Sequence, residues 1–252
     1  MPGSAIPSLN WVDINRVIDF AALRFKKSVE TVRRAEAAAT RVDPTLAIVR
    51  AGILGQPIVA EDDIDATVSI TKTIQNAVGL FHQDVLGAVE GWSSSGPSGG
   101  AIDLKGVSPI TQQPIVAELK MRWNTIKASD EKNTWDALKQ AATVSSPETV
   151  AYVFQIVPKT NTPYDIPWKV SGRESIDRVR CADGVTAYHL VTGNPDALFE
   201  LLAALPYIVG QVLSRQLGDE ASAEFAFLHR ESVVKELMAA SLPPQSAHAS
   251  SE

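Results

Sequence analysis

The chain has 252 residues, of which 45% are hydrophobic, and carries 23 lysines and arginines against 29 aspartates and glutamates. This size and composition predict a globular protein with a substantial core, built as one large elaborated domain. The single cysteine, Cys181, excludes an intramolecular disulfide and a cysteine-rich metal site, and we expect it to be a small core residue. The 4 histidines are too widely scattered for a helical zinc pair.

The net charge of -6 conceals an uneven distribution of charged residues. Residues 104–180 carry eleven basic and eight acidic side chains, a balance of +3. The balance is nine against twelve (-3) in residues 1–103 and three against nine (-6) in residues 181–252. Phosphate binding depends on the local field, so an acidic protein can still hold DNA along one basic cleft. The overall charge therefore does not exclude a nucleic acid partner.

Membrane insertion is not expected. The longest apolar stretch, residues 198–212, is interrupted by Glu200, Pro206 and Gly210. The amino terminus has no basic segment followed by a hydrophobic run, the pattern of a secretory signal. We therefore expect a soluble, cytoplasmic protein.

Three helices are predicted in the first third of the chain. Apolar side chains recur at three- and four-residue steps over residues 13–42, which indicates a long amphipathic helix that ends at Asp43 and Pro44. Two further helices are predicted over residues 44–52 and 64–86, the second after a cluster of acidic residues.

Three strands are predicted next, around residues 87–92, 100–105 and 115–120. A loop rich in serine and glycine separates the first two strands. A turn-rich segment with two prolines joins the second to the third, so these two strands are expected to pair as a hairpin.

The second half of the chain mixes helices and strands. Residues 150–157 are apolar and β-branched, which is typical of a buried strand. Residues 159–177 contain two prolines and a glycine and are expected to be a long irregular segment of the kind that carries function. The other expected elements are a helix over 134–144, a strand over 185–192, helices over 195–240 with breaks at Pro206 and Gly218, and a disordered tail from Leu242.

Asp103 and the strand over residues 115–120 carry the most informative side chains. Strand alternation places Glu118 and Lys120 on one face and turns Leu119 toward the core. Pairing with the preceding strand brings Asp103 beside Glu118. Two converging carboxylates attract a hard cation such as Mg²⁺. This combination indicates metal-dependent phosphodiester hydrolysis.

The triplet of an acid, any residue and a lysine is a weak signal by itself, because it occurs at residues 103–105, 118–120 and 130–132. Only at Glu118 does it combine with an apolar strand, an upstream acid on a strand, and a following basic and aromatic segment. On the residues alone, an exposed Glu/Lys strand face is the competing interpretation.

The order of elements, with acids on the second and third strands, resembles the PD-(D/E)xK core of type II restriction endonucleases. The more specific resemblance is to the family that cuts GGNCC and GGWCC sites, and it covers roughly residues 67–205. One departure is Ile102, which stands where the motif has proline, although the acid carries the chemistry. The matching segments are 81–87, 102–103, 117–125 and 184–193.

The resemblance implies an α/β fold with a mixed central sheet flanked by helices. It divides the chain into an N-terminal helical extension (1–60), a nuclease core with recognition insertions (61–240) and a disordered tail (241–252). It also implies a homodimer acting on double-stranded DNA with Mg²⁺, because a palindromic site mirrors a two-fold axis.

The roles of individual residues follow from what phosphodiester cleavage requires. Asp103, Glu118 and the backbone carbonyl of Leu119 would bind the metal ion. Lys120 would orient or help to deprotonate the attacking water, or stabilise developing negative charge. Two candidates to complete the metal shell are Gln83 and Glu90, although a polar helix-surface role is the commoner one for such residues.

Candidate DNA contacts follow the third strand and occupy the irregular segment, from which side chains can reach phosphates or base edges. Trp168 could stack on a base, whereas Trp123 is expected in the core and His82 is expected to be structural. The candidates for DNA binding are Arg122, Asn124, Lys127, Lys169, Arg173, Arg178 and Arg180.

Other functions are compatible with the same core. A repair or recombination nuclease would cut structured or damaged DNA without a short palindrome. A DNA-binding protein could keep the fold without the activity, but the intact Asp103, Glu118 and Lys120 argue against it. An unrelated α/β protein is the remaining alternative.

Overall fold

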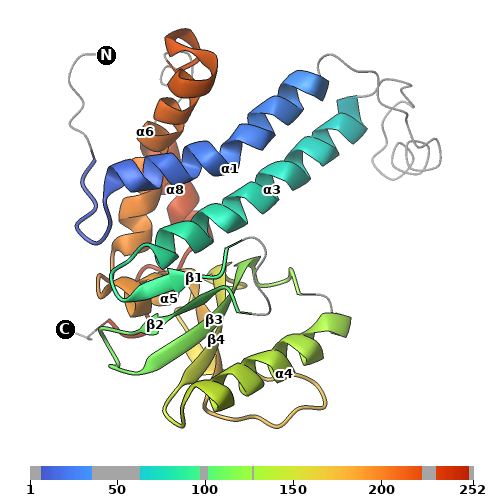
Figure 1. The fold of residues 1–252 in the computed structure, drawn as a ribbon, viewed down its shortest axis with the longest axis vertical. Coiled ribbons are helices and arrows are strands. Elements are labelled where there is room, and N and C mark those ends of the chain that lie inside the picture. The colour runs from blue at the N-terminus through green and yellow to red at the C-terminus, as the bar shows by residue number, and fades with distance from the viewer. Residues whose placement is uncertain (1–6, 36–62, 97–101, 127, 223–230, 250–252) are drawn as a thin grey trace.

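A computed structural model describes residues 7–35, 63–96, 102–126, 128–222 and 231–249 of the chain (Figure 1). The helix expected over 44–52 and the expected boundary near residue 60 lie outside these residues.

A six-stranded mixed sheet forms the centre of the described structure, with strand order β1-β2-β3-β4-β6-β5. The inner strands β3, β4 and β6 run parallel, and the other pairs are antiparallel. The strands are β1 (Trp92–Ser94), β2 (Leu104–Val107), β3 (Pro114–Arg122), β4 (Val150–Val157), β5 (Asp165–Pro167) and β6 (Val179–Asp183). The helices are α1 (Ile14–Ala35), α3 (Asp63–Gly87), α4 (Ala128–Ser145), α5 (Gly184–Thr192), α6 (Ala197–Leu217) and α8 (Glu231–Ser241).

Helices cover both faces of the sheet. In Figure 1, α4 lies on one side and α1, α3 and α6 lie on the other. The alternation of β3 explains this arrangement, because Ala117 and Leu119 join the core beneath α3, α5 and α6, whereas Val116 packs with Trp135 and Leu138 of α4. The expected α/β fold, a mixed sheet flanked by helices, is confirmed.

Most elements lie where the sequence pattern places them. The expected order of a helix, three strands, a helix and a strand is confirmed, and β4 has the expected bounds. The first two strands begin later than expected: β1 starts at Trp92 because α3 continues to Gly87, and β2 starts at Leu104, so Asp103 immediately precedes it. Cys181 is 6% exposed in the core, and burial raises the pKa of its thiol to about 12.

The strand expected over residues 185–192 is wrong, because this segment is helix α5. The Asp183 carboxylate caps the helix by accepting the Thr186 N–H at 3.0 Å and the Thr186 hydroxyl at 2.7 Å. Gly193, with a φ of 75°, ends it. The helix is buried on all sides, so its apolar run lacks the periodicity that distinguishes a helix from a buried strand.

Three other expectations are corrected. Helix α6 continues through Pro206 and ends at Gly218, because burial of Leu201, Ala204 and Ile208 outweighs the lost backbone bond. The irregular segment over 159–177 contains the short edge strand β5. Trp123 is 43% exposed with the Lys159 ammonium 5.0 Å from its ring centre, whereas Trp168 is 9% exposed in the core and not available for stacking.

Residues 242–249 pack on the domain, so the expected disordered tail is wrong for them. The Leu242 side chain is buried, and the Ser246 hydroxyl lies 2.9 Å from His189 Nδ1. The His248 Nε2 atom lies 2.6 Å from the Asp165 carboxylate. These contacts fix the segment against α5 and β5.

Within the described residues, α6 is the one helix long and apolar enough to cross a membrane. Its residues Leu198, Leu201, Ile208 and Val212 are buried in the main core.

The buried His82 supports the fold. It is 5% exposed, and its Nδ1 atom lies 2.7 Å from the hydroxyl of the buried Tyr188. Burial lowers the pKa of His82 from 6.5 to about 4. The expected structural role of His82 agrees with this position.

His82 should make stability depend on pH. Between pH 6.5 and about pH 4, His82 is protonated in the unfolded chain but neutral in the folded protein. The contribution of neutral His82 to the free energy of unfolding is therefore complete above pH 6.5 and is lost as the pH falls. We expect wild type to lose about 2 kcal/mol more than His82→Gln between pH 7.5 and pH 5 in urea denaturation. A difference in unfolding free energy that stays constant over this interval would contradict the assignment.

Candidate active site

The site lies where strand β3 loses its neighbour. Strand β2 pairs with β3 from the Val107–Pro114 pair to the Leu104–Ala117 pair. Beyond Ala117, β3 has no strand partner on this side among the described residues, so this edge of β3 is open. Asp103 lies immediately before β2, beside the point where this open edge of β3 begins. Its N–H donates to the Ala117 carbonyl at 2.9 Å, and its Oδ2 atom accepts the Leu119 N–H at 2.7 Å. The carboxylate thus takes the place of the next backbone partner.

Glu118 and Lys120 project from the same face of β3, as the alternation predicts. The Lys120 Nζ atom lies 2.6 Å from Glu118 Oε1, and the two side chains are 28% and 14% exposed respectively. The second oxygen, Glu118 Oε2, is buried and has no hydrogen-bond partner among the described residues. A buried carboxylate oxygen without a partner is costly, so something absent from the polypeptide is expected to bind it.

Burial and mutual repulsion act on the two carboxylates. Burial is the main cause that raises the pKa of Asp103, opposed by the Leu119 N–H and by Lys120. Burial also raises the pKa of Glu118, and the charge of Asp103 raises it further. A single ammonium, Lys120, therefore leaves the two acids incompletely neutralised.

These residues fit a hard divalent cation. The free Glu118 oxygen and the Asp103 carboxylate supply oxygen ligands of the type that Mg²⁺ prefers. The Leu119 carbonyl points to the open edge with its own N–H, because both groups of a strand residue face the same side. No cluster of three His, Cys, Asp or Glu side chains suited to a metal occurs in the described residues, so water or substrate would complete the shell.

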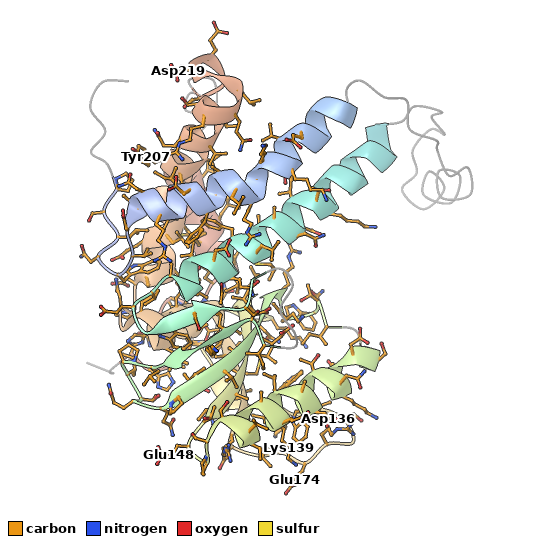
Figure 2. The ribbon with its side chains drawn as sticks, in the orientation of Figure 1. Asp136, Lys139, Glu148, Glu174, Tyr207 and Asp219 are labelled. Carbon is orange, nitrogen blue, oxygen red and sulfur yellow. The ribbon has the colours of Figure 1, made fainter. Side chains whose placement is uncertain are left out.

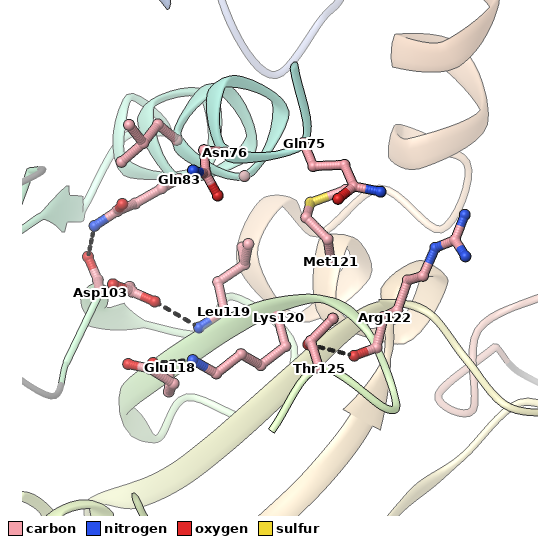
Figure 3. A pocket seen from close by; sticks show the side chains of 12 residues that line it. Gln75, Asn76, Gln83, Asp103, Glu118, Leu119, Lys120, Met121, Arg122 and Thr125 are labelled. Atoms are coloured by element: carbon pink, nitrogen blue, oxygen red, sulfur yellow. Dashed lines mark hydrogen bonds and ion pairs between the residues drawn. The ribbon is translucent and has the colours of Figure 1, made fainter. Parts of the chain in front are cut away.

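A cleft of about 630 Å³ opens over these groups, between α3 and β3 (Figure 3). Gln83 of α3 forms part of its wall and donates to the Asp103 carbonyl and to Ser95 Oγ, both at 3.3 Å. The structure thus brings Gln83 to the site. Glu90 instead lines a separate hollow beside residues 7–14, away from the carboxylates.

The expected DNA contacts divide into two groups. Arg122 lines the cleft, Asn124 is exposed in the turn that follows β3, and Lys169 is exposed beyond β5. Lys127 lies outside the described residues.

The other three arginines make contacts that hold the fold together. Arg178 donates to the carbonyls of Ala142, Ser146 and Thr149, which anchors the end of α4. Arg180 binds the side chain and backbone of Asp165, and Arg173 pairs with Asp136 on α4 (Figure 2). The structure does not bring these arginines to the cleft.

Sequence reasoning missed Gln75 and Asn76, which line the cleft from α3. Both are neutral and exposed, so no strand pattern or charge cluster marks them. The available signal was helical spacing from Gln83, which places them on the same helix face two turns away.

Removing the Glu118 charge should stabilise the protein in the absence of metal. Glu118→Gln relieves repulsion with Asp103 while its amide oxygen can still accept from Lys120, so we expect the Tm in EDTA at pH 7.5 to rise by roughly 2 °C or more. The gain should shrink as the pH falls, because wild-type Glu118 then becomes protonated. The exposed Glu148, which lies away from the cleft (Figure 2), provides the control Glu148→Gln, and a fall in Tm for Glu118→Gln would contradict the repulsion.

Comparison with known proteins identifies the family. The family model for the Eco47II restriction endonuclease matches residues 12–214. The chain is 35% identical over 173 residues to the type II restriction enzyme Eco47II of Escherichia coli, covering 65% of this chain and 69% of that protein. It is 26% identical over 224 residues to the type II restriction enzyme Sau96I of Staphylococcus aureus, covering 84% and 82% of the two chains. Type II restriction endonucleases act on double-stranded DNA and generally use a divalent metal ion. The chain belongs to the Eco47II restriction endonuclease family of site-specific deoxyribonucleases.

Proposed function

We propose that the protein hydrolyses double-stranded DNA with Mg²⁺ at a short palindrome of the GGNCC or GGWCC type, using the cleft between α3 and β3. The observation that carries this proposal is the pairing of Asp103 and Glu118 at the open edge of β3, with one Glu118 oxygen buried and unpartnered. Family membership supports double-stranded DNA as the substrate, and the cleft beside the two carboxylates supports this location for its hydrolysis.

Asp103, Glu118 and the Leu119 carbonyl would hold the metal ion. A bound Mg²⁺ supplies charge neutralisation at the scissile phosphate and lowers the pKa of water. Gln83 holds the Asp103 backbone in place through its hydrogen bond to the carbonyl, and this is the accessory role that the structure supports for it.

Lys120 would orient the attacking water or help to deprotonate it, or stabilise developing negative charge. Its ammonium is partly exposed at the cleft and lies 2.6 Å from Glu118, so it can donate to the attacking water or to a phosphate oxygen without leaving the carboxylate. Its positive charge also opposes the raised pKa values of the acids, which helps to keep them ionised for metal binding.

Arg122 and Asn124 are the proposed DNA contacts nearest to the metal site, because they continue directly from β3 into the turn at the cleft. Lys169 and Lys127 stay predictions for more distant phosphate contacts. We propose that the protein acts in the cytoplasm without a membrane partner.

Replacing the charged groups of the site should separate cleavage from binding. We expect Glu118→Ala and Lys120→Ala each to lower the cleavage rate with Mg²⁺ at least about a hundredfold. Gel-shift affinity for a duplex carrying the mapped cut site should stay within about threefold of wild type, because base contacts made elsewhere supply the specificity. Without metal, Glu118→Ala should bind more tightly, because one carboxylate no longer repels the phosphate.

A second triplet with the same spacing provides matched controls. Asp130→Ala and Lys132→Ala remove an acid and a lysine two residues apart near the start of α4; neither residue lines the cleft, so both variants should cleave normally. Wild-type cleavage by Glu118→Ala would refute the proposed metal site. Equal losses of binding and cleavage in a folded variant would assign the residue to recognition instead.

A palindromic site read by two identical subunits requires a dimer. We expect sedimentation to give twice the chain mass of 27.1 kDa at micromolar concentration, with cuts in both strands during one binding event. A monomer that nicks one strand at a time would contradict the homodimer.

A further inference from the structure

We propose that the cleft-facing stripe of α3, formed by Lys72, Gln75 and Asn76, binds the phosphate backbone of the strand that enters the active site. The proposal deepens the proposed function and rests on it, because it takes the cleft as the place where the scissile strand lies. The amides would act as neutral hydrogen-bond donors and the lysine as a cation further along the same strand.

The three residues occupy one face of the helix. Gln75 and Asn76 line the cleft with Gly79 and Gln83, and Lys72 lies one turn further toward the helix amino terminus at the same angular position. At 1.5 Å per residue, the stripe from Lys72 to Gln83 extends about 16 Å, close to five nucleotides of one DNA strand. Gln83 fixes one end of this stripe to the Asp103 backbone.

The amide groups are available to a ligand. Both side chains are exposed, and within the described residues neither has a hydrogen-bond partner. Figure 3 shows them projecting from α3 toward β3, across the cleft from Leu119, Met121 and Arg122. Gly79 of α3 faces Met121 of β3, and a Cβ atom at this position would lie 3.6 Å from Met121 Cγ, an ordinary packing distance.

The neutrality of the wall beside the carboxylates has a physical reason. A lysine there could pair with Asp103 or Glu118, as Lys120 does, and would compete with the metal ion for the same oxygens. An amide N–H donates to a phosphate oxygen without this competition. A cation first appears at Lys72, far enough along the helix to neutralise a phosphate without reaching the acids.

Phosphate contacts, base contacts and charged contacts differ in how their loss changes DNA affinity and its salt dependence. Phosphate contacts weaken binding to all sequences alike when they are lost, whereas base contacts change the discrimination between sequences. Loss of a neutral donor releases no counterion, so the amides should not affect the slope of log K against log salt. Loss of Lys72 should reduce that slope by about 1.

The test compares three proteins by fluorescence anisotropy in EDTA, on a duplex with the mapped cut site and on a scrambled duplex. We expect Gln75→Ala/Asn76→Ala to bind both duplexes roughly tenfold more weakly than wild type with an unchanged salt slope. Lys72→Gln should bind both more weakly with a reduced slope. Alanine favours the helix and both positions are exposed, so the fold is expected to be kept.

A matched control exists on α4, where Asn133 and Gln140 are also exposed amides without a described partner, but on the opposite face of the sheet. Asn133→Ala/Gln140→Ala should bind both duplexes like wild type. Unchanged affinity of the α3 variants, equal loss in the control, or loss confined to the specific duplex would each overturn the proposal. Glu118→Ala, assayed alongside for cleavage, distinguishes failure of the α3 contact from failure of the proposed function. If Glu118→Ala cleaves normally, the proposed function itself fails.

Discussion

The hydrogen bond from the Leu119 N–H to the Asp103 carboxylate is the interaction on which the site depends. It satisfies a strand donor at the point where β2 stops pairing with β3, so the strand can continue to Arg122 with an open edge. It also holds Asp103 beside Glu118, at the margin of the sheet and not within it. Without this bond the Asp103 carboxylate would lose the contact that directs it to β3, and the Leu119 N–H at the edge of the strand would be unpaired.

The same arrangement explains why the site is electrostatically unfavourable without a ligand. Two partly buried carboxylates share one ammonium, and one oxygen of Glu118 has no partner among the described residues. A protein that binds a cation at such a place exchanges stability for function, because the groups that attract the ion repel each other in its absence. The surrounding core, with α3 and α6 on one face and α4 on the other, supplies the rigidity that keeps them together.

The sequence predicts the central part of the fold and the juxtaposition of Asp103, Glu118 and Lys120 well, because both follow from short-range rules. Strand alternation fixes the common face of Glu118 and Lys120, and a hairpin brings Asp103 to them. The errors arise where tertiary context decides. Helix α5 is buried on every side and shows no helical period, and Pro206 is carried inside α6 by the packing of its neighbours. The hydrogen bonds of Arg178 and Arg180 join segments far apart in sequence, so no local pattern could show that these guanidinium groups stabilise the fold.

The central claim is that Asp103, Glu118 and the Leu119 carbonyl form one cation site, and the most direct test is a crystal structure of the protein grown with Mn²⁺ in place of Mg²⁺. Anomalous scattering locates the manganese ion without reference to activity. The account predicts one peak at the open edge of β3 within about 2.3 Å of an oxygen from each of the three groups. A structure with no peak there, or with an ion bound by other residues of the cleft while Glu118 Oε2 stays unliganded, would contradict it.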